Sequence, residues 1–524
     1  MTPSLPTAVD QGTPVATPAS APAVTPPATT PPATTPLTTT PPASNPARTL
    51  TAGGLAVLLL AFLPVNFTFG AVNLLVPAIA ADLDAGPSGG QLVLSAYTTT
   101  FAAGLVVSGR LGDRYGRRRL LLIGLIAFGV LAVLTGLAQS VVSLVALRAA
   151  LGLAAGLFTP QVLTSIQATA PDRLRTRGII LFTAAGAVAS IAGQVVAGAI
   201  AVTLPEHLAW RAVQVVTGLI ALLALPGLRA VQESRSTAPL GLDLRGAVLL
   251  GGGLVALVVP LTLGPTAGWP AWSLGLLGAA AVTLTAFALA QRATERRGGL
   301  PVVPPSVLRV AVVRNGLLMT LLFFVSYGAI LYEISQYART AWGADGWGVA
   351  MVTLGFGGGF LVAALLLPGV LGRVGPRIMV YAASGQALAL LGIALVVALD
   401  DGRSAPPALQ PLLIVLGAVQ ALMYGPALQT VLSRTPDWAA GVAGGLLTTL
   451  QQLGIGLGVA LLGSLFHAVA AAAGGPAGGT AAANATGSGS GLAVGFATAL
   501  TVQAGCAVVF ALLAHRVTRR GAAG

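Results

Sequence analysis

The sequence predicts an all-α polytopic membrane protein with 14 transmembrane helices, and three observations lead to this fold class. The 524 residues are 55% hydrophobic and only 8% charged, with a mean hydropathy of +0.87. A water-soluble protein could not cover so much apolar surface with so few charges. Apolar stretches of about 20 residues, long enough to cross ~30 Å of hydrocarbon, recur along the chain. Each stretch must pair its own backbone groups in lipid, which favours helices.

The chain begins with residues 1–49, which are rich in Pro, Thr and Ala and lack the positive start and apolar core of a signal peptide. We expect this segment to be a disordered cytoplasmic tail, and a misplaced start codon is the alternative. The expected spans after it are residues 51–78, 91–109, 119–138, 141–164, 178–202, 211–228, 246–264, 272–291, 315–336, 347–371, 377–398, 410–432, 440–467 and 491–515.

The arginines indicate the orientation of these spans. All 27 basic side chains are arginines, and a cytoplasmic N-terminus places nearly all of them in cytoplasmic segments. Only Arg211, Arg339 and Arg403 then fall on the opposite side, and Arg148 falls within a span. The positive-inside rule therefore predicts a multi-pass protein of the cell membrane with both termini in the cytoplasm. Cytoplasmic loops also explain the net charge of +13 without a nucleic-acid partner.

The segment GRLGDRYGRRR, residues 109–119, lies between the second and third expected spans. Its glycines allow a tight turn, and its aspartate lies among arginines with which it can pair. A basic loop that only sets the topology is the simpler alternative. A degraded copy, GRVGPRIMVYAASG at 372–385, follows the tenth span, as an internal repeat predicts. The candidate residues of the loop are Gly109, Arg110, Gly112, Asp113, Arg114, Gly116, Arg117 and Arg118.

GRLGDRYGRRR closely resembles the signature loop of the major facilitator superfamily, and 14 spans resemble its drug:proton antiporter branch. AVNLLVPAIAADL (71–83), RAALGLAAG (148–156) and GVAGGLLTTLQQLGIGLGVA (441–460) resemble further motifs of that branch. The resemblance implies a major facilitator fold in which the loop around Asp113 latches two six-helix halves on the cytoplasmic side. The implied parts are a six-helix half at 50–230, two extra linker helices at 231–300, a second half at 301–516 and a cytoplasmic tail at 517–524.

The chain departs from that branch at three positions. By alignment on Asn73, the aspartate common in the first helix of the family is replaced by Thr68. The Gly-Pro of the fifth helix becomes Gly193 followed by Gln194, and the glutamine of the fourth helix becomes Leu151. The first change argues against dicationic substrates, because a membrane carboxylate is their natural counter-charge.

Glu333 is the only one of the 14 acidic residues that falls within an expected span, and a proton-driven transporter needs a group that binds a proton. It lies about 27 Å along the ninth span at ~1.5 Å per residue, so a glutamate at the water interface is the alternative. Arg148 lies in the fourth span, where an unpaired cation costs about 3 kcal/mol, so we expect a partner or a water-filled cavity beside it. A fixed pair that only joins two helices is the alternative. We expect Arg148 and Glu333 to couple across a cavity, with Glu333 taking the proton.

The resemblance implies a substrate cavity lined by helices 1, 2, 4 and 5 and their counterparts in the second half. Neutral hydrogen-bonding groups on apolar walls suit an amphiphilic organic molecule better than a small ion. The alternative role of such groups is to join helices to one another. The candidate cavity residues are Asn66, Thr68, Asn73, Tyr97, Gln161, Gln194, Tyr327, Gln420, Tyr424, Gln451 and Gln452.

The sequence thus predicts a monomeric secondary active transporter, not an enzyme, that exports amphiphilic drugs or metabolites in exchange for protons by alternating access. Multidrug efflux of this kind confers antibiotic resistance. The chain has no Walker loop and no metal-binding cluster, so we expect no cofactor besides the proton gradient. Two alternatives stay open: a dedicated exporter of one endogenous antibiotic or secondary metabolite, and a non-transporting membrane sensor or scaffold on the same fold.

Overall fold

The computed structural model describes residues 50–235, 243–264, 267–299, 301–399, 406–435, 437–474 and 488–519. The tail expected at 1–49 and the last residues of the C-terminal tail, 520–524, lie outside this range. Contacts divide the chain into a unit at Met1–Ala47 and a unit at Arg48–Gly524, and only the second is described here. Every regular element among the described residues is a helix, which confirms the predicted all-α class.

The helices follow the expected spans in order. Twelve helices among the described residues are long and apolar enough to cross a membrane. This count does not include α2 and α5, in which several side chains lie outside the described residues. The long helices are α1 (Ala52–Asp82), α2 (Gly86–Tyr115), α3 (Arg117–Gly136), α4 (Val141–Thr169), α5 (Asp172–Thr203), α6 (Glu206–Leu223), α7 (Leu244–Leu263), α8 (Ala271–Arg296), α10 (Ala311–Trp342), α11 (Gly346–Val374), α12 (Ile378–Leu399), α13 (Pro406–Ser433), α14 (Asp437–Ala472) and α15 (Ser488–Arg519). Short helical turns are η1 (Pro226–Ala230), α9 (Pro305–Arg309) and η2 (Gly375–Arg377).

Many of the helices extend beyond the expected apolar spans, and polar residues cap some of their first turns. The α14 helix begins at Asp437 rather than 440 and ends at Ala472 rather than 467. The Thr51 hydroxyl accepts a hydrogen bond from the Gly54 N–H at the start of α1, and Asp345 does the same for Gly348 at the start of α11. Such caps satisfy backbone donors that the first turn of a helix leaves free.

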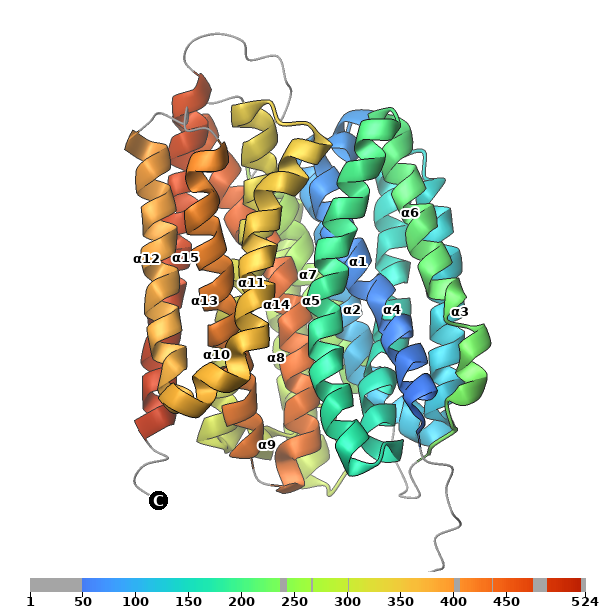
Figure 1. Cartoon of the computed structure of the whole chain (residues 1–524). Coiled ribbons are helices and arrows are strands. Elements are labelled where there is room, and N and C mark those ends of the chain that lie inside the picture. The colour runs from blue at the N-terminus through green and yellow to red at the C-terminus, as the bar shows by residue number, and fades with distance from the viewer. Residues whose placement is uncertain are drawn as a thin grey trace, which may run out of the picture. The chain divides into compact units, whose positions relative to one another are not determined.

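The packing of α1–α6 is repeated by α10–α15 (Figure 1). Helices α1 and α5 pack together, as do α2 and α4, and α3 and α6. The same pattern joins α10 to α14, α11 to α13, and α12 to α15. The two sets meet where α2 contacts α14 and α5 contacts α11, while α7 packs on α2, α8 and α14. We call the two sets the first and second bundles.

Glycines let paired helices approach closely at equivalent places of the two bundles. A Cβ atom at Gly193 of α5 would lie 2.2 Å from the carbonyl oxygen of Phe67 in α1. A Cβ atom at Gly458 of α14 would lie 2.1 Å from the carbonyl oxygen of Val325 in α10. Small residues drive helix association in lipid through such close backbone contacts.

We expect Gly193→Ala to destabilise the first bundle by about 1–3 kcal/mol, because backbone atoms cannot move aside as a flexible side chain can. Thermal unfolding of the purified protein in detergent measures this loss. The matched control is Gly358→Ala in α11, where an added Cβ meets nothing within 4 Å and the better helix propensity of alanine should stabilise slightly. Equal unfolding temperatures for the two variants would contradict this packing.

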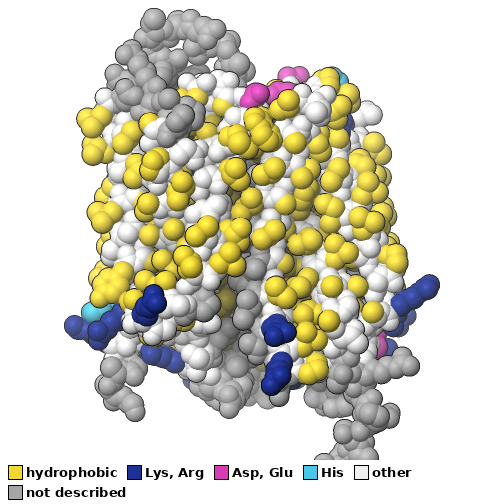
Figure 2. All heavy atoms as spheres, viewed as in Figure 1, with side chains coloured by type: hydrophobic (Ala, Val, Ile, Leu, Met, Phe, Trp, Pro, Cys, Tyr) yellow, Lys and Arg dark blue, Asp and Glu magenta, His cyan; other side chains and the backbone are white. Residues whose placement is uncertain are grey.

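The two ends of the helices carry opposite charges. Figure 2 shows arginines gathered at one end, acidic residues at the other, and hydrophobic side chains across the surface between them. Asp82, Glu206 and Asp345 lie at what we call the acidic end, where α1 ends and α6 and α11 begin. Arg117, Arg314 and Arg516 belong to the opposite, arginine-rich end. The apolar belt is the surface that faces lipid in a multi-pass membrane protein.

Candidate functional site

Glu333 is fully buried in α10 rather than exposed at an interface. Its side chain is 0% exposed, and Oε2 accepts a 2.7 Å hydrogen bond from Nε2 of Gln503 in α15. Its other oxygen, Oε1, has no hydrogen-bond partner in the described structure. Since the one described hydrogen bond comes from a neutral amide, the carboxyl has an open position for a proton.

A chain of buried polar groups continues from Gln503 through the second bundle. Ser326 of α10 donates to Oε1 of Gln503 at 3.0 Å, and Gln386 of α12 donates to the Ser326 hydroxyl at 3.2 Å. Each of these side chains is at most 1% exposed. We call Gln386, Ser326, Gln503 and Glu333 the glutamine network. The network joins α10, α12 and α15, and every member lies among apolar residues of the same core.

Ser326, Gln386 and Gln503 are not among the residues predicted from the sequence. Gln386 and Gln503 lie in α12 and α15, which are not expected to line a cavity, and Ser326 lies in α10 beside the candidate Tyr327. A signal was nevertheless present, because polar residues in apolar spans are costly unless they have partners.

Arg148 is also fully buried, in α4 of the first bundle. Its Nη1 donates to the Thr68 hydroxyl at 3.1 Å and its Nε donates to the Val93 carbonyl at 3.3 Å. The guanidinium lies over the Tyr97 ring, 4.5 Å from its centroid, an arrangement that stabilises a cation. Nη2 has no hydrogen-bond partner in the described structure. Thr68, where the resembled family has an aspartate, therefore gives Arg148 a neutral partner.

Arg148 and Glu333 are not joined in this structure, contrary to the expected coupling. No hydrogen bond or ion pair among the described residues links them, and their partners lie in different bundles. Arg339, six residues after Glu333, instead pairs with Glu206 at 2.8 Å. Arg339 therefore leaves Glu333 unneutralised, as expected from its position on the helix.

Two of the candidate cavity residues meet in a small pocket between the bundles. Gln194 of α5 and Tyr327 of α10 line it together with Ser190, Phe356 and Phe360. Gln194 replaces the proline of the resembled motif. Its amide and the hydroxyls of Ser190 and Tyr327 are the polar groups of a wall that is otherwise apolar and aromatic. The pocket has a volume of about 20 Å³, which is smaller than the site of an organic ligand.

An aromatic cluster adjoins this pocket in the second bundle. The Tyr424 ring stacks on Phe323 with centroids 5.0 Å apart, and Phe324 meets Tyr424 edge-on at 4.8 Å. Tyr327 stacks on Phe323 at 6.1 Å and contacts Phe356 of the pocket at 6.2 Å. Aromatic walls of this kind favour planar apolar groups.

The other candidate cavity residues have mixed surroundings. The Gln161 amide donates to the Ser108 carbonyl at 2.8 Å and so joins α4 to α2. Asn73 donates to the Phe69 carbonyl of its own helix. Gln420 is buried with no partner in the described structure, Asn66 has an unpartnered Nδ2, Gln451 lies 3.5 Å from the Tyr424 hydroxyl, and Gln452 is half-buried.

The GRLGDRYGRRR segment turns between α2 and α3. Gly116 has φ +106°, which favours glycine, and ends one helix as it begins the next. Arg117 and Arg118 contact Ser234 and Glu233 of the segment that follows η1. Gly109 and Gly112 are helical, but the side chains of Arg110 and Asp113 lie outside the described residues, so the predicted latch stays a prediction.

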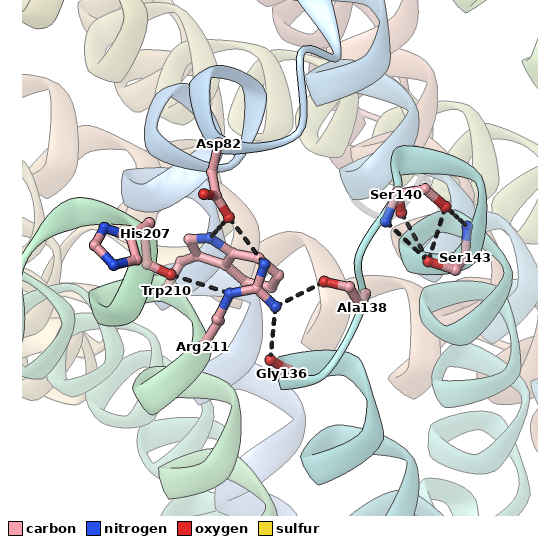
Figure 3. A network of polar contacts seen from close by, with 8 residues as sticks. All are labelled: Asp82, Gly136, Ala138, Ser140, Ser143, His207, Trp210 and Arg211. Atoms are coloured by element: carbon pink, nitrogen blue, oxygen red, sulfur yellow. Dashed lines mark hydrogen bonds and ion pairs between the residues drawn. The ribbon is translucent and has the colours of Figure 1, made fainter.

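The acidic end of the first bundle is held by a polar network centred on Arg211 (Figure 3). Arg211 pairs with Asp82 at 3.0 Å and donates to the Gly136 and Ala138 carbonyls at 3.2 and 2.7 Å. The Trp210 indole also donates to Asp82 at 3.0 Å. These contacts tie the end of α1 to the start of α6 and to the α3–α4 turn.

The bundles are hydrogen-bonded to each other between the middle and the acidic end. Arg339 of α10 pairs with Glu206 of α6. The Ser335 hydroxyl donates to the Asn73 carbonyl at 3.1 Å, and Ser464 of α14 donates to Gln91 of α2 at 3.0 Å. The structure is therefore closed at its acidic end.

We expect Arg339→Gln to shift the protein toward states that are open at the acidic end. Exposed ion pairs contribute at most about 1 kcal/mol. The ratio of open to closed states should therefore rise by no more than about fivefold. Spin labels at Leu204 and Trp347, exposed near this end on different bundles, would measure it in a Cys506→Ser background. The control is Arg373→Gln at the arginine-rich end. If this variant opens the acidic end as much as Arg339→Gln does, the Arg339–Glu206 pair has no gating role.

Comparisons with known proteins agree with this architecture. The family model described as "Major Facilitator Superfamily" matches residues 58–459. The chain is 29% identical to a "Probable actinorhodin transporter" of Streptomyces coelicolor, over 75% of this chain and 69% of that protein. It is 32% identical to "Puromycin resistance protein pur8" of Streptomyces alboniger, over 78% and 80%. The solved inward-open structure of the xylose transporter XylE from E. coli superposes with a TM-score of 0.58 at 16% identity, covering 87% and 94%.

Proposed function

Because the chain belongs to the Major Facilitator Superfamily, we propose that it is a secondary transporter that exports amphiphilic drugs or metabolites in exchange for protons. It is not an enzyme. The relatives named for actinorhodin transport and puromycin resistance support a drug or metabolite as the substrate. Alternating access about a site between the two bundles supplies the mechanism.

The observation that carries the substrate class is the pocket shared by Gln194 and Tyr327. It lies between elements of different bundles and has a volume of only about 20 Å³, which is room for about one water molecule. The bundles would therefore have to move apart before an organic substrate could enter it. Its aromatic neighbours Phe323 and Tyr424 extend the apolar wall. The described pocket lining has an amide and hydroxyls but no carboxylate, which favours neutral or weakly charged amphiphiles over dications.

We assign the coupling proton to Glu333. An ionised carboxylate buried without a cation is costly. Glu333 can therefore lose its proton only when water reaches it or when the helices around it rearrange. Rocking of the second bundle would open or close a path from the glutamine network to water. Proton uptake and release by Glu333 would then accompany the change between the two open states.

The topology we propose has 14 spans, with α2 and α5 added to the 12 apolar helices, and both termini in the cytoplasm. The repeated packing of α1–α6 and α10–α15 supports two halves with α7 and α8 between them. The arginine-rich end is then cytoplasmic. Closure at the acidic end means that this structure is not outward-open, and we expect the protein to work as a monomer.

Transport by purified protein in liposomes tests this function. We expect a panel that contains puromycin and neutral amphiphilic dyes to be transported faster when a pH gradient is imposed than without one. A dedicated exporter of one antibiotic or secondary metabolite would transport a single chemical series from a diverse panel. A non-transporting sensor would give no flux with any compound, which would reject the proposal.

A further inference from the structure

A cavity of about 400 Å³ lies where α8 ends and the short helix α9 begins. This volume is within the roughly 300–1,000 Å³ of small-molecule sites. Arg292 and Arg296 of α8 and Arg309 of α9 line the cavity, and Phe287 and Leu308 give it an apolar side. Its lining residues belong to α8 and to the segment from Val303 to Arg309, so the cavity lies outside the site described above.

The cavity is held open by hydrogen bonds that do not use the arginines. Glu295, which also lines it, accepts hydrogen bonds from the backbone N–H of Ser306 at 3.0 Å and from the Ser306 hydroxyl. Gln291 donates to Asp243 at 2.7 Å and accepts from the Val303 N–H at 2.9 Å. These bonds fix the loop between α8 and α9 against the start of α7.

The three arginines keep an excess of positive charge in the cavity. Arg309 lies near enough to Glu295 to interact electrostatically. Across the described part of the chain, none of the three forms an ion pair or a hydrogen bond with a carboxylate. Three guanidinium groups against one carboxylate leave net positive charge facing an open cavity, and guanidinium forks match phosphate geometry.

An exposed apolar stripe on α8 runs toward this charge. Val282 and Leu289 are 70% and 58% exposed, and Arg296 follows Leu289 by seven residues, as Leu289 follows Val282. A seven-residue spacing places all three on one side of a helix. Acyl chains lying on this stripe would bring a headgroup phosphate to the arginines.

We propose that the α8–α9 cavity binds the phosphate headgroup of an anionic phospholipid from the leaflet at the arginine-rich end. Basic pockets between helices at that level bind such headgroups by charge and hydrogen bonding. The lipid would wedge between the linker helices and the loop to α9. This site does not depend on the transported substrate or on Glu333.

Native mass spectrometry of the full-length protein, purified and then mixed with equal amounts of phosphatidylglycerol and phosphatidylcholine of identical acyl chains, tests the site. We expect the wild type to retain more phosphatidylglycerol. The triple variant Arg292→Gln, Arg296→Gln and Arg309→Gln should lose this preference by at least about fivefold, since each arginine contributes to the attraction of anionic lipid. Glu295→Gln keeps the Ser306 acceptor and removes the opposing charge, so it should increase retention.

The matched control removes three exposed arginines elsewhere at the same end, by Arg373→Gln, Arg377→Gln and Arg516→Gln. It should keep the preference for phosphatidylglycerol. Equal loss in the control variant would show a diffuse charge effect and overturn the proposal, as would unchanged retention in the cavity variant. The Glu295→Gln variant keeps every arginine and provides an independent result. If it retains no more phosphatidylglycerol than the wild type, that result also contradicts the site.

Discussion

Glu333→Gln is expected to abolish export driven by a pH gradient while substrate still moves down its own gradient. Glutamine matches glutamate in shape but cannot release a proton, so the variant behaves as a permanently neutral carrier. We expect the rate of export driven by the pH gradient to fall at least tenfold. A tenfold fall corresponds to a loss of about 1.4 kcal/mol in the free energy that couples proton movement to export. Efflux from preloaded liposomes is measured with and without the pH gradient. The comparison separates export driven by protons from movement of substrate down its own gradient.

Two companion variants show whether the surroundings of Glu333 matter. Glu333→Asp keeps the carboxyl but shortens its reach to Gln503, so part of the pH-driven export should remain. Gln503→Leu keeps the carboxyl and removes its 2.7 Å donor, so export should fall less than in Glu333→Gln. Full pH-driven export by Glu333→Gln would reject Glu333 as the coupling residue.

Arg148→Leu is expected to stop transport without unfolding the protein. Replacing a buried charge by an apolar residue of similar size is often neutral or stabilising, and the neighbours Thr68 and Tyr97 keep other hydrogen-bond options. A buried guanidinium with an unpartnered Nη2 is retained at a cost, which points to use during the transport cycle. We therefore expect export to fall by at least about tenfold while the unfolding temperature is nearly unchanged.

Thr68→Val is the control for this variant because it removes only the 3.1 Å hydrogen bond to Arg148. The loss of one hydrogen bond to a charged group costs about 1.5–3 kcal/mol, so its main effect should be on stability and its effect on export smaller. If Arg148→Leu unfolds at a much lower temperature and its remaining folded fraction transports normally, Arg148 has only a structural role.

The helices could be predicted from the sequence because hydropathy and backbone pairing in lipid act locally. The presence of a helix at each expected span follows from about 20 apolar residues, whichever helices surround it. The ends were less predictable: α14 extends at both ends, and α9 forms in a short segment that hydropathy does not mark. Caps and interfacial residues decide these ends.

The partners of the buried charges could not be predicted because they depend on packing between distant helices. Gln503 lies 170 residues from Glu333, and only the contact of α10 with α15 brings the two together. The depth of Glu333 along its span suggested an interface, yet neighbouring helices bury it. For Arg148 the sequence predicted a partner or a water-filled cavity, with Glu333 as the expected partner, whereas the structure places Thr68 and Tyr97 against it.

The central claim is that substrate export is coupled to protons through Glu333. Its most direct test uses liposomes that carry the purified protein in their membrane and a pH-sensitive dye in their interior. The dye reports proton movement while substrate crosses the membrane. With a substrate gradient and no initial pH gradient, we predict that wild-type protein moves protons in the direction opposite to the substrate and that Glu333→Gln moves substrate alone. Substrate flux through the wild type without any proton movement would contradict the claim.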